Sequence, residues 1–251
     1  MKRTLIFAHR VTLELLRDPL SWIFALGFPI VMLFVMTLVN QSIPAEAAMT
    51  IFQLPSLVPA VWVFGMTFLM LFGAQLMSKD RSEAFLIRLY LSPMTAPDFL
   101  MGYLLPITVL GILQGIITCL TGSVIGLFTG ESISVPGAAL TFLLSLPSLI
   151  LFISMGMLFG VLLSERAAPG ISSAVISAAS LLGGIWMDVD AMGGAWLKIC
   201  RALPFYHAVK LARAGVSADM NGVPLGLGVV SVYAVSVFAL AAVLFTRQKR
   251  K

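Results

Sequence analysis

The sequence predicts an all-α integral membrane protein with six transmembrane helices, an N-terminal interfacial amphipathic helix, and an outer re-entrant helical hairpin between spans five and six. Two observations carry this prediction. Hydrophobic residues make up 59% of the 251 residues and charged residues only 11%, too few to cover a water-facing surface. Six apolar segments are also long enough to cross a bilayer. We therefore treat residues 1–251 as a single transmembrane domain.

Residues 1–19 predict an amphipathic helix that lies in the inner membrane interface. At about 100° per residue, four charged side chains fall on one face: Arg3, Arg10, Glu14 and Arg17. The opposite face carries Leu5, Ala8, Thr12, Leu15 and Leu16. We expect this helix to end at Asp18-Pro19, because the residue before a proline avoids the helical region. An ordinary capping segment before the first span is the alternative.

The apolar segments divide the rest of the chain. We place the spans at residues 20–39, 53–77, 99–128, 137–163, 170–187 and 223–246. The third span is longer than a bilayer core of about 30 Å requires, so we expect it to tilt, bend or protrude.

The positions of the Lys and Arg residues predict the orientation. Twelve of the 16 lie before the first span, in the 78–98 and 164–169 loops, or after the last span. The loops at 40–52 and 129–136 contain none. Because basic residues favour the cytoplasmic side, we expect both termini in the cytoplasm. Since these charges sit where lipid headgroups lie, the net charge of +5 does not indicate a nucleic-acid partner.

Residues 188–222 carry the other four basic residues although the alternation of spans places them outside. Leu203-Pro204 divides the segment into two short helical pieces, Ala195–Ala202 and Phe205–Gly215. Each piece has two basic residues three positions apart, Lys198 and Arg201 in the first and Lys210 and Arg213 in the second. This spacing places both on the same side of the helix and favours one water-facing side. A half-buried outer helical hairpin fits this pattern.

The loop at 78–98 has a charged first half and an apolar second half. No Gly or Pro interrupts residues 78–91, so we predict a short helix there. Such a helix suits the cytoplasmic surface, where a soluble partner can touch it. A charged loop that only fixes the topology is the alternative.

The six predicted spans contain no Asp, Glu, Lys, Arg or His. Ion-coupled transporters usually carry ionisable groups at mid-membrane, so the energy for uphill transport has to come from elsewhere. The chain has no phosphate-binding loop of the G-x-x-x-x-G-K-[ST] type either. Its two cysteines, Cys119 and Cys200, give no metal spacing, and we expect no metal and no cofactor in this chain. A transport subunit driven by a separate ATPase satisfies these observations, as does an ATPase-independent secondary transporter or channel.

Three stretches carry a resemblance to a known family. In the loop and the helix after it, the matching residues are Arg81 to Glu83, Leu86, Arg88, Leu89, Ser92, Pro93, Thr95, Gly102, Leu104 and Leu105. Arg17-Asp18-Pro19 and the string from Leu203 to Arg213 match as well. These stretches resemble the type-2 ABC transporter permeases, the membrane subunits of ATP-driven exporters. The chain departs from that family's pattern at Ala84-Phe85, where Gly-Thr is usual, and at Tyr103, where Lys is usual.

The resemblance implies a bacterial inner-membrane permease that is not itself an enzyme. Its partners would be a separate ABC ATPase, which holds ATP and Mg²⁺, and a second permease copy in a homodimer. The cargo would be an amphipathic or hydrophobic drug, peptide or lipid-like compound, exported by alternating access. The loop would couple the ATPase to the spans through Lys79, Asp80, Arg81, Glu83, Arg88 and Pro93.

Small residues recur in the fifth span. Gly170, Ala174 and Ala178 are spaced by four residues, with Ser177 beside them, and this spacing lets another backbone approach closely. Packing within the chain is one explanation. A dimer interface near the translocation path is the other, because the resembling family places its first and fifth spans there.

Two further spans carry candidate cavity residues: Trp62, Phe68, Met70 and Gln114. The second span is rich in aromatic and Met residues, and because Met adapts to irregular partners, this span could line a cavity for an apolar cargo. Lipid contact is the alternative for the second span, and a hydrogen bond to a neighbouring helix is the alternative for Gln114.

Overall fold

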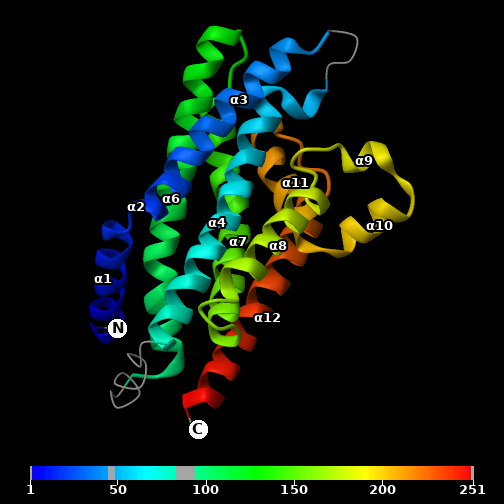
Figure 1. Cartoon of the computed structure of the whole chain (residues 1–251). Coiled ribbons are helices and arrows are strands. Elements are labelled where there is room, and N and C mark those ends of the chain that lie inside the picture. Colours follow the sequence, from blue (N-terminus) through cyan, green and yellow to red (C-terminus); the bar gives the residue numbers. More distant parts are fainter. Residues whose placement is uncertain (1, 45–48, 83–93, 250–251) are drawn as a thin grey trace.

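The computed structural model describes residues 2–44, 49–82 and 94–249, and within these ranges every regular element is a helix (Figure 1). The all-α prediction is therefore confirmed. The N-terminal part comprises α1 (Lys2–Arg17), α2 (Pro19–Trp22), a π-helical turn η1 (Ile23–Gly27), α3 (Phe28–Ser42) and a 3₁₀ turn η3 (Thr50–Phe52). The remaining helices are α4 (Leu54–Ser82), α6 (Ala96–Thr129), α7 (Val135–Leu162), α8 (Ala168–Leu182), α9 (Val189–Met192), α10 (Gly194–Ala202), α11 (Pro204–Ser217) and α12 (Val223–Lys249).

Five helical segments of the described ranges are long and apolar enough to cross a membrane: Ile23–Ser42, Leu54–Ser82, Ala96–Thr129, Val135–Leu162 and Val223–Arg247. The predicted fifth span, 170–187, instead contains α8, which has 15 residues. At a rise of about 1.5 Å per residue it is about 22 Å long, shorter than a bilayer core of about 30 Å. The chain turns after it, because Gly184 takes a left-handed backbone conformation with φ of 70°.

The helix α4 forms the centre of the bundle. In the most apolar 18-residue stretch of α4, 89% is buried inside the protein. The corresponding share is 22% for Ile23–Ser42 and 17% for α12. The close contact between α4 and α7 depends on Gly156, because a Cβ atom there would lie 2.3 Å from the Met70 carbonyl oxygen. The first apolar segment and α12 therefore expose most of their surface, whereas α4 exposes little.

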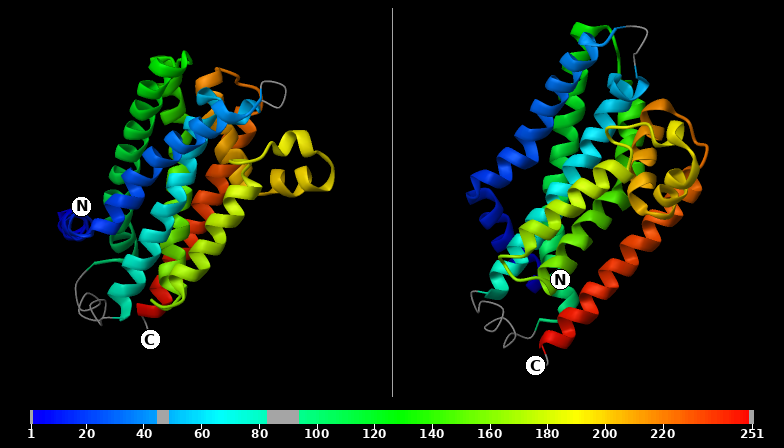
Figure 2. Two further views of the ribbon diagram at one scale, coloured as in Figure 1. Left: turned by 45° about the horizontal axis from the view of Figure 1, so that its top comes forward. Right: turned by 45° about the vertical axis from the view of Figure 1, so that its right-hand side comes forward.

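Both chain termini lie at the same end of the bundle, which we call the termini end (Figure 1). The last turn of α4 and the first turn of α6 lie at this end as well. In the left view of Figure 2 the helix α1 is seen nearly along its own axis, while the long helices are seen from the side. It therefore lies at a steep angle to them, as an interfacial helix would.

The two short helical pieces predicted within residues 188–222 are present as α10 and α11. Both helices match the predicted pieces to within two residues, and they are separated at Leu203-Pro204. Most of α11 is buried against α4, α7 and α12, whereas α9 and α10 project sideways from the bundle (Figures 1 and 2). The short helix predicted over 78–91 differs: residues 78–82 are the continuation of α4, and the rest lies outside the described residues.

Candidate functional site

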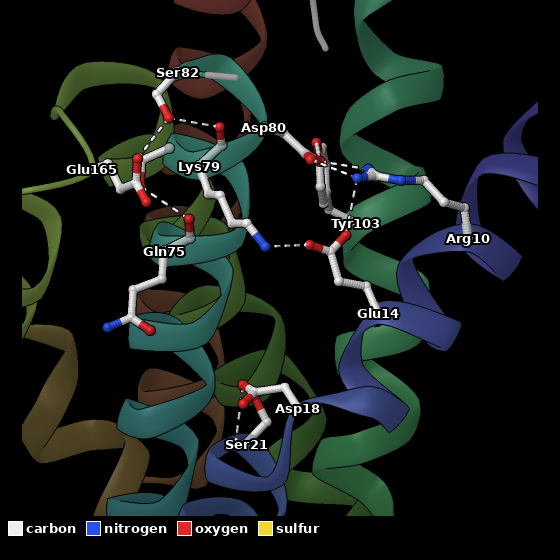
Figure 3. A network of polar contacts seen from close by, with 11 residues as sticks. Arg10, Glu14, Asp18, Ser21, Gln75, Lys79, Asp80, Ser82, Tyr103 and Glu165 are labelled. Atoms are coloured by element: carbon white, nitrogen blue, oxygen red, sulfur yellow. Dashed lines mark hydrogen bonds and ion pairs between the residues drawn. The ribbon is translucent and has the colours of Figure 1, made fainter. Parts of the chain in front are cut away.

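The charged residues at the end of α4 meet α1, α6 and the turn between α7 and α8 at the termini end (Figure 3). They form a polar network that we call the junction. It is built around Lys79, Asp80 and Arg81 of α4, three consecutive residues that point to three different neighbours.

Asp80 is the buried centre of the junction, with no exposed surface. The Arg10 guanidinium of α1 donates to both carboxylate oxygens, at 2.6 Å each, and the Tyr103 hydroxyl of α6 donates to one of them at 2.5 Å. A buried carboxylate is stable only when it is paired and hydrogen-bonded, and a bidentate Arg–carboxylate pair is the strongest common arrangement. One carboxylate therefore holds three helices together.

The helix α1 has a second ion pair to α4. Glu14 lies 3.0 Å from the Arg10 guanidinium and 3.3 Å from the Lys79 ammonium, so it bridges two cations. The hydrogen bond to Asp80 is the largest influence on Arg10 and raises the pKa of its guanidinium above the ordinary value. Arg10 therefore stays charged at every physiological pH.

Aromatic packing fixes the same helix against α6. The Phe7 ring makes edge-to-face contacts with the rings of Phe99 and Tyr103, at centroid distances of 5.4 and 5.0 Å. Gly102 makes room for this ring, because a Cβ atom there would lie 2.4 Å from the Phe7 ring. Near the start of α6, the Thr4 hydroxyl donates to the Asp98 carboxylate at 2.9 Å.

Arg81 points the other way, toward the end of α7. Its guanidinium donates to the carbonyl oxygens of Val161 and Leu163, in the last turn of α7 and just beyond it. Carbonyl groups at a helix C-terminus lack helical partners and carry partial negative charge, so a cation satisfies both needs. Ser82 adds a hydrogen bond of 2.6 Å to Glu165 in the turn that leads to α8. The end of α4 is thus tied to both flanks of the bundle.

The sequence prediction named Lys79, Asp80 and Arg81 as contact charges. The structure places Lys79 on the surface, but it buries the Asp80 carboxylate and engages the Arg81 guanidinium with carbonyl groups. Three further predicted coupling residues, Glu83, Arg88 and Pro93, lie outside the described residues.

Sequence reasoning missed Arg10 and Tyr103 as the partners of Asp80. Arg10 was assigned to the charged face of α1. Its partner, Asp80, lies 70 residues away in the sequence, so a local pattern does not reveal it. A signal was present at Tyr103, which stands where the resembling family usually has Lys. Both side chains can donate a hydrogen bond to a carboxylate, so a donor at this position is the signal that could have indicated a buried acidic partner.

A pocket of about 320 Å³ opens beside the junction, between α1, α4 and α8. Its lining contains three acids and one lysine, together with the apolar side chains of Leu15, Phe72 and Leu76. The charged members are Glu14, Asp18, Lys79 and Glu165. The pocket thus offers both charged and apolar side chains to a ligand.

The predicted cavity residues lie elsewhere. Trp62 and Met70 are buried in the helical core, and Phe68 packs among other aromatic rings. Gln114 is fully buried, and its amide donates to the Ala25 carbonyl at 2.6 Å, which confirms the alternative of a hydrogen bond to a neighbouring helix. None of the four lines the pocket beside the junction.

The predicted dimer residues lie on one face of α8. Gly170, Ala174 and Ser177 are exposed in the single chain, and Ala178 is half-exposed. No other described part of the chain covers this face, and its role in a dimer stays a prediction.

The chain was compared with known proteins. Residues 3–216 match the protein family described as ABC-2 type transporter. No curated protein matches the chain.

Proposed function

The chain belongs to the ABC-2 type transporter family, and from this premise we propose that it is the permease subunit of an ATP-driven exporter of amphipathic compounds. Family membership makes it a multi-pass membrane permease component that pairs with an ABC ATPase in a separate chain. Export, the class of cargo and the mechanism below are our proposal.

The observation that carries the proposal is the junction at the end of α4. Asp80 lies in the last turns of the most buried long helix and is held by α1 and α6 at once. The partner ATPase, with its bound ATP and Mg²⁺, would act on residues 78–98, of which 78–82 are the end of α4. A force at that point reaches the core directly because α4 is one continuous helix from Leu54 to Ser82.

The polar contacts specify which elements would move together. Through Asp80 and Glu14, displacement of the α4 end pulls on α1 and α6. Through Arg81 and Ser82, it pulls on the end of α7 and the turn before α8. Nucleotide-driven closure of the ATPase would therefore rearrange both flanks of the bundle and alternate access to the translocation path.

The pocket beside the junction supports an amphipathic cargo. It lies at the termini end, where a compound from the inner leaflet would enter, and its lining combines acids with apolar side chains. An amphipathic molecule can contact both kinds of side chain, whereas a purely polar solute leaves the apolar ones in water.

The remaining expectations complete the proposed assembly. A homodimer formed through the exposed face of α8 would bury its small residues and let this short helix act as the sixth span. Both termini would lie in the cytoplasm of a bacterial cell, with the α10–α11 hairpin on the outer side. The positions of both termini at one end of the bundle support this orientation.

The experiment that tests the proposal is co-purification followed by reconstitution. The chain is isolated from its native membrane in mild detergent, and a stoichiometric ATPase with a phosphate-binding loop is expected with it. In vesicles holding both proteins, ATP should drive uptake of a fluorescent cationic amphiphile. Asp80→Asn should abolish uptake while the complex still hydrolyses ATP, and Lys198→Gln, an exposed charge on the distant α10, should transport normally. Isolation of the chain alone, with uptake that needs no ATP, would refute the proposal.

A further inference from the structure

A second pocket, of about 160 Å³, lies at the opposite end of the bundle from the junction. It is formed by the turn after α8, by α9 and α11, and by the loop and first turn of α12. Its lining includes Gly184, Asp188, His207, Lys210, Arg213 and Gly222. Pockets for drug-sized ligands measure about 300–1,000 Å³, so this one suits a small chemical group rather than a whole drug.

Arg213 is the unusual residue of this pocket. Its guanidinium is half-buried and donates from Nε to the Ser56 carbonyl at 3.2 Å and from Nη2 to the Ile185 carbonyl at 3.4 Å. Within the described residues no carboxylate lies within 4.0 Å of it. Burial lowers the pKa of this guanidinium, although the charges of Asp188 and Asp190 oppose that effect. A guanidinium has five N–H donors, so two on Nη1 and one on Nη2 remain for a ligand, and one from each nitrogen can form a parallel pair.

The acidic residues nearby are engaged in a different way. Asp190 accepts hydrogen bonds from the Tyr206 hydroxyl at 2.7 Å and from the Lys210 ammonium at 3.2 Å. Lys210 is therefore paired with Asp190, which also lies 3.5 Å from the Arg201 guanidinium. Asp188 caps α9 through one carboxylate oxygen, at 3.1 Å from the Ala191 N–H, and is exposed. The pocket thus presents one incompletely paired cation, Arg213, and the exposed carboxylates of Asp188 and Asp219, of which Asp188 is the one whose charge acts on Arg213.

The position of the pocket relates it to the membrane surface. It lies beside α10, which projects from the bundle with Lys198 and Arg201 exposed next to an exposed Ile199. A short helix with basic and apolar side chains of this kind suits the level of the lipid headgroups. Trp196 on the same helix is a residue type enriched at that level.

We propose that this pocket binds the headgroup of a zwitterionic phospholipid, with its phosphate at Arg213 and its ammonium group at Asp188. Arginine binds phosphate oxygens through two parallel hydrogen bonds, and this is the preferred recognition of phosphate by a partly desolvated cation. A purely anionic headgroup satisfies Arg213 but meets the negative charge of Asp188. This site is separate from the junction and does not depend on the proposed export function.

Native mass spectrometry of the purified full chain in detergent tests the proposal. Phosphatidylethanolamine should be retained more strongly than phosphatidylglycerol, which has the phosphate but no ammonium group. Arg213→Gln should weaken the retention of phosphatidylethanolamine about tenfold, the size expected for a bidentate charged contact. Arg166→Gln removes an exposed arginine in the turn between α7 and α8, away from the pocket, and should leave retention unchanged.

Two further variants separate recognition from folding. Arg213→Lys keeps the charge and should recover part of the retention if the glutamine variant is unstable. Asp188→Asn should remove the preference for phosphatidylethanolamine over phosphatidylglycerol. Equal retention of both lipids by the unaltered chain, or unchanged retention by a folded Arg213→Gln variant, would overturn the proposal. Soluble phosphoethanolamine is run in parallel: binding of it without binding of the lipid would support the recognised group but overturn its assignment to a lipid.

Discussion

The side-chain amide of Gln114 donates a hydrogen bond of 2.6 Å to the main-chain carbonyl of Ala25, and both residues are fully buried. The carbonyl lies in the π-helical turn η1, where the Phe28 N–H bonds to the Ile23 carbonyl five residues back. In an α-helical register the partner of Ala25 would be Pro29, which has no N–H. Gln114 therefore supplies a donor to a carbonyl that the proline deprives of its usual partner.

This relationship predicts a specific coupling between Gln114 and Gly65. A Cβ atom at Gly65 would lie 2.6 Å from the Gln114 amide nitrogen, so Gly65→Ala should displace the amide and destabilise the chain. Gln114→Ala alone should cost about 1–3 kcal/mol, because it leaves a buried carbonyl without its donor. In the double variant the clash is gone, and the two costs should be less than additive. Thermal unfolding in detergent measures all three, and strict additivity would contradict the relationship.

The Asp80 ion pair predicts an asymmetric response to mutation. Arg10→Gln should destabilise the chain by about 3 kcal/mol, because it leaves the buried Asp80 carboxylate without its counter-charge. Asp80→Asn should cost less, because the partly exposed Arg10 guanidinium keeps Glu14 at 3.0 Å. The combined change of Asp80→Leu and Arg10→Met removes both charges and should recover most of that loss. Stability is followed by unfolding in detergent. Single variants as stable as the unaltered chain would show that the pair does not hold α1 in place.

Asp190 predicts a pH dependence of the segment formed by α9, α10 and α11. Burial acts to raise the pKa of this carboxyl, but hydrogen bonds from Tyr206 and Lys210 outweigh it and lower the pKa below the ordinary value. The stabilisation is therefore complete above the unfolded-state pKa of about 3.9 and is lost as the pH falls through the lower folded-state value. Amide protection factors in α9 and α10 should fall as the pH drops below about 4. Asp190→Asn is the control and should show no such fall.

The exposed face of α8 predicts a crosslink between two copies of the chain. With Cys119 and Cys200 replaced by serine, Ala174→Cys should form a disulfide-linked dimer in native membranes under mild oxidation. Val232→Cys is the matched control, because Val232 is 65% exposed on α12, away from this face. A dimer band for the α12 cysteine and none for the α8 cysteine would move the proposed interface to another surface.

The sequence by itself determined the class of protein and most of the helices. A helix that crosses a bilayer must be apolar over the thickness of the bilayer core, whichever neighbours it packs against. The five long helices in the described residues therefore all correspond to predicted spans, four of them to within three residues at both ends, and α4 continues five residues beyond its predicted end. Prolines mark breaks for an equally local reason, which is why Leu203-Pro204 correctly divided α10 from α11. The predicted fifth span ended at residue 187, whereas α8 ends at Leu182. The prediction was too long because the apolar composition continues through the glycine turn that follows α8.

The tertiary structure decided which polar groups meet. Arg10 pairs with Asp80 across 70 residues and Gln114 reaches Ala25 across 89, and neither separation leaves a trace in a local pattern. Long membrane helices are apolar on all sides, so periodicity does not reveal which face meets which neighbour. That choice rests on the packing of side chains between helices, such as Gly102 against Phe7 and Gly156 against α4. This packing buries Asp80, which the sequence alone had placed on the surface, so that its carboxylate lies at the centre of the junction.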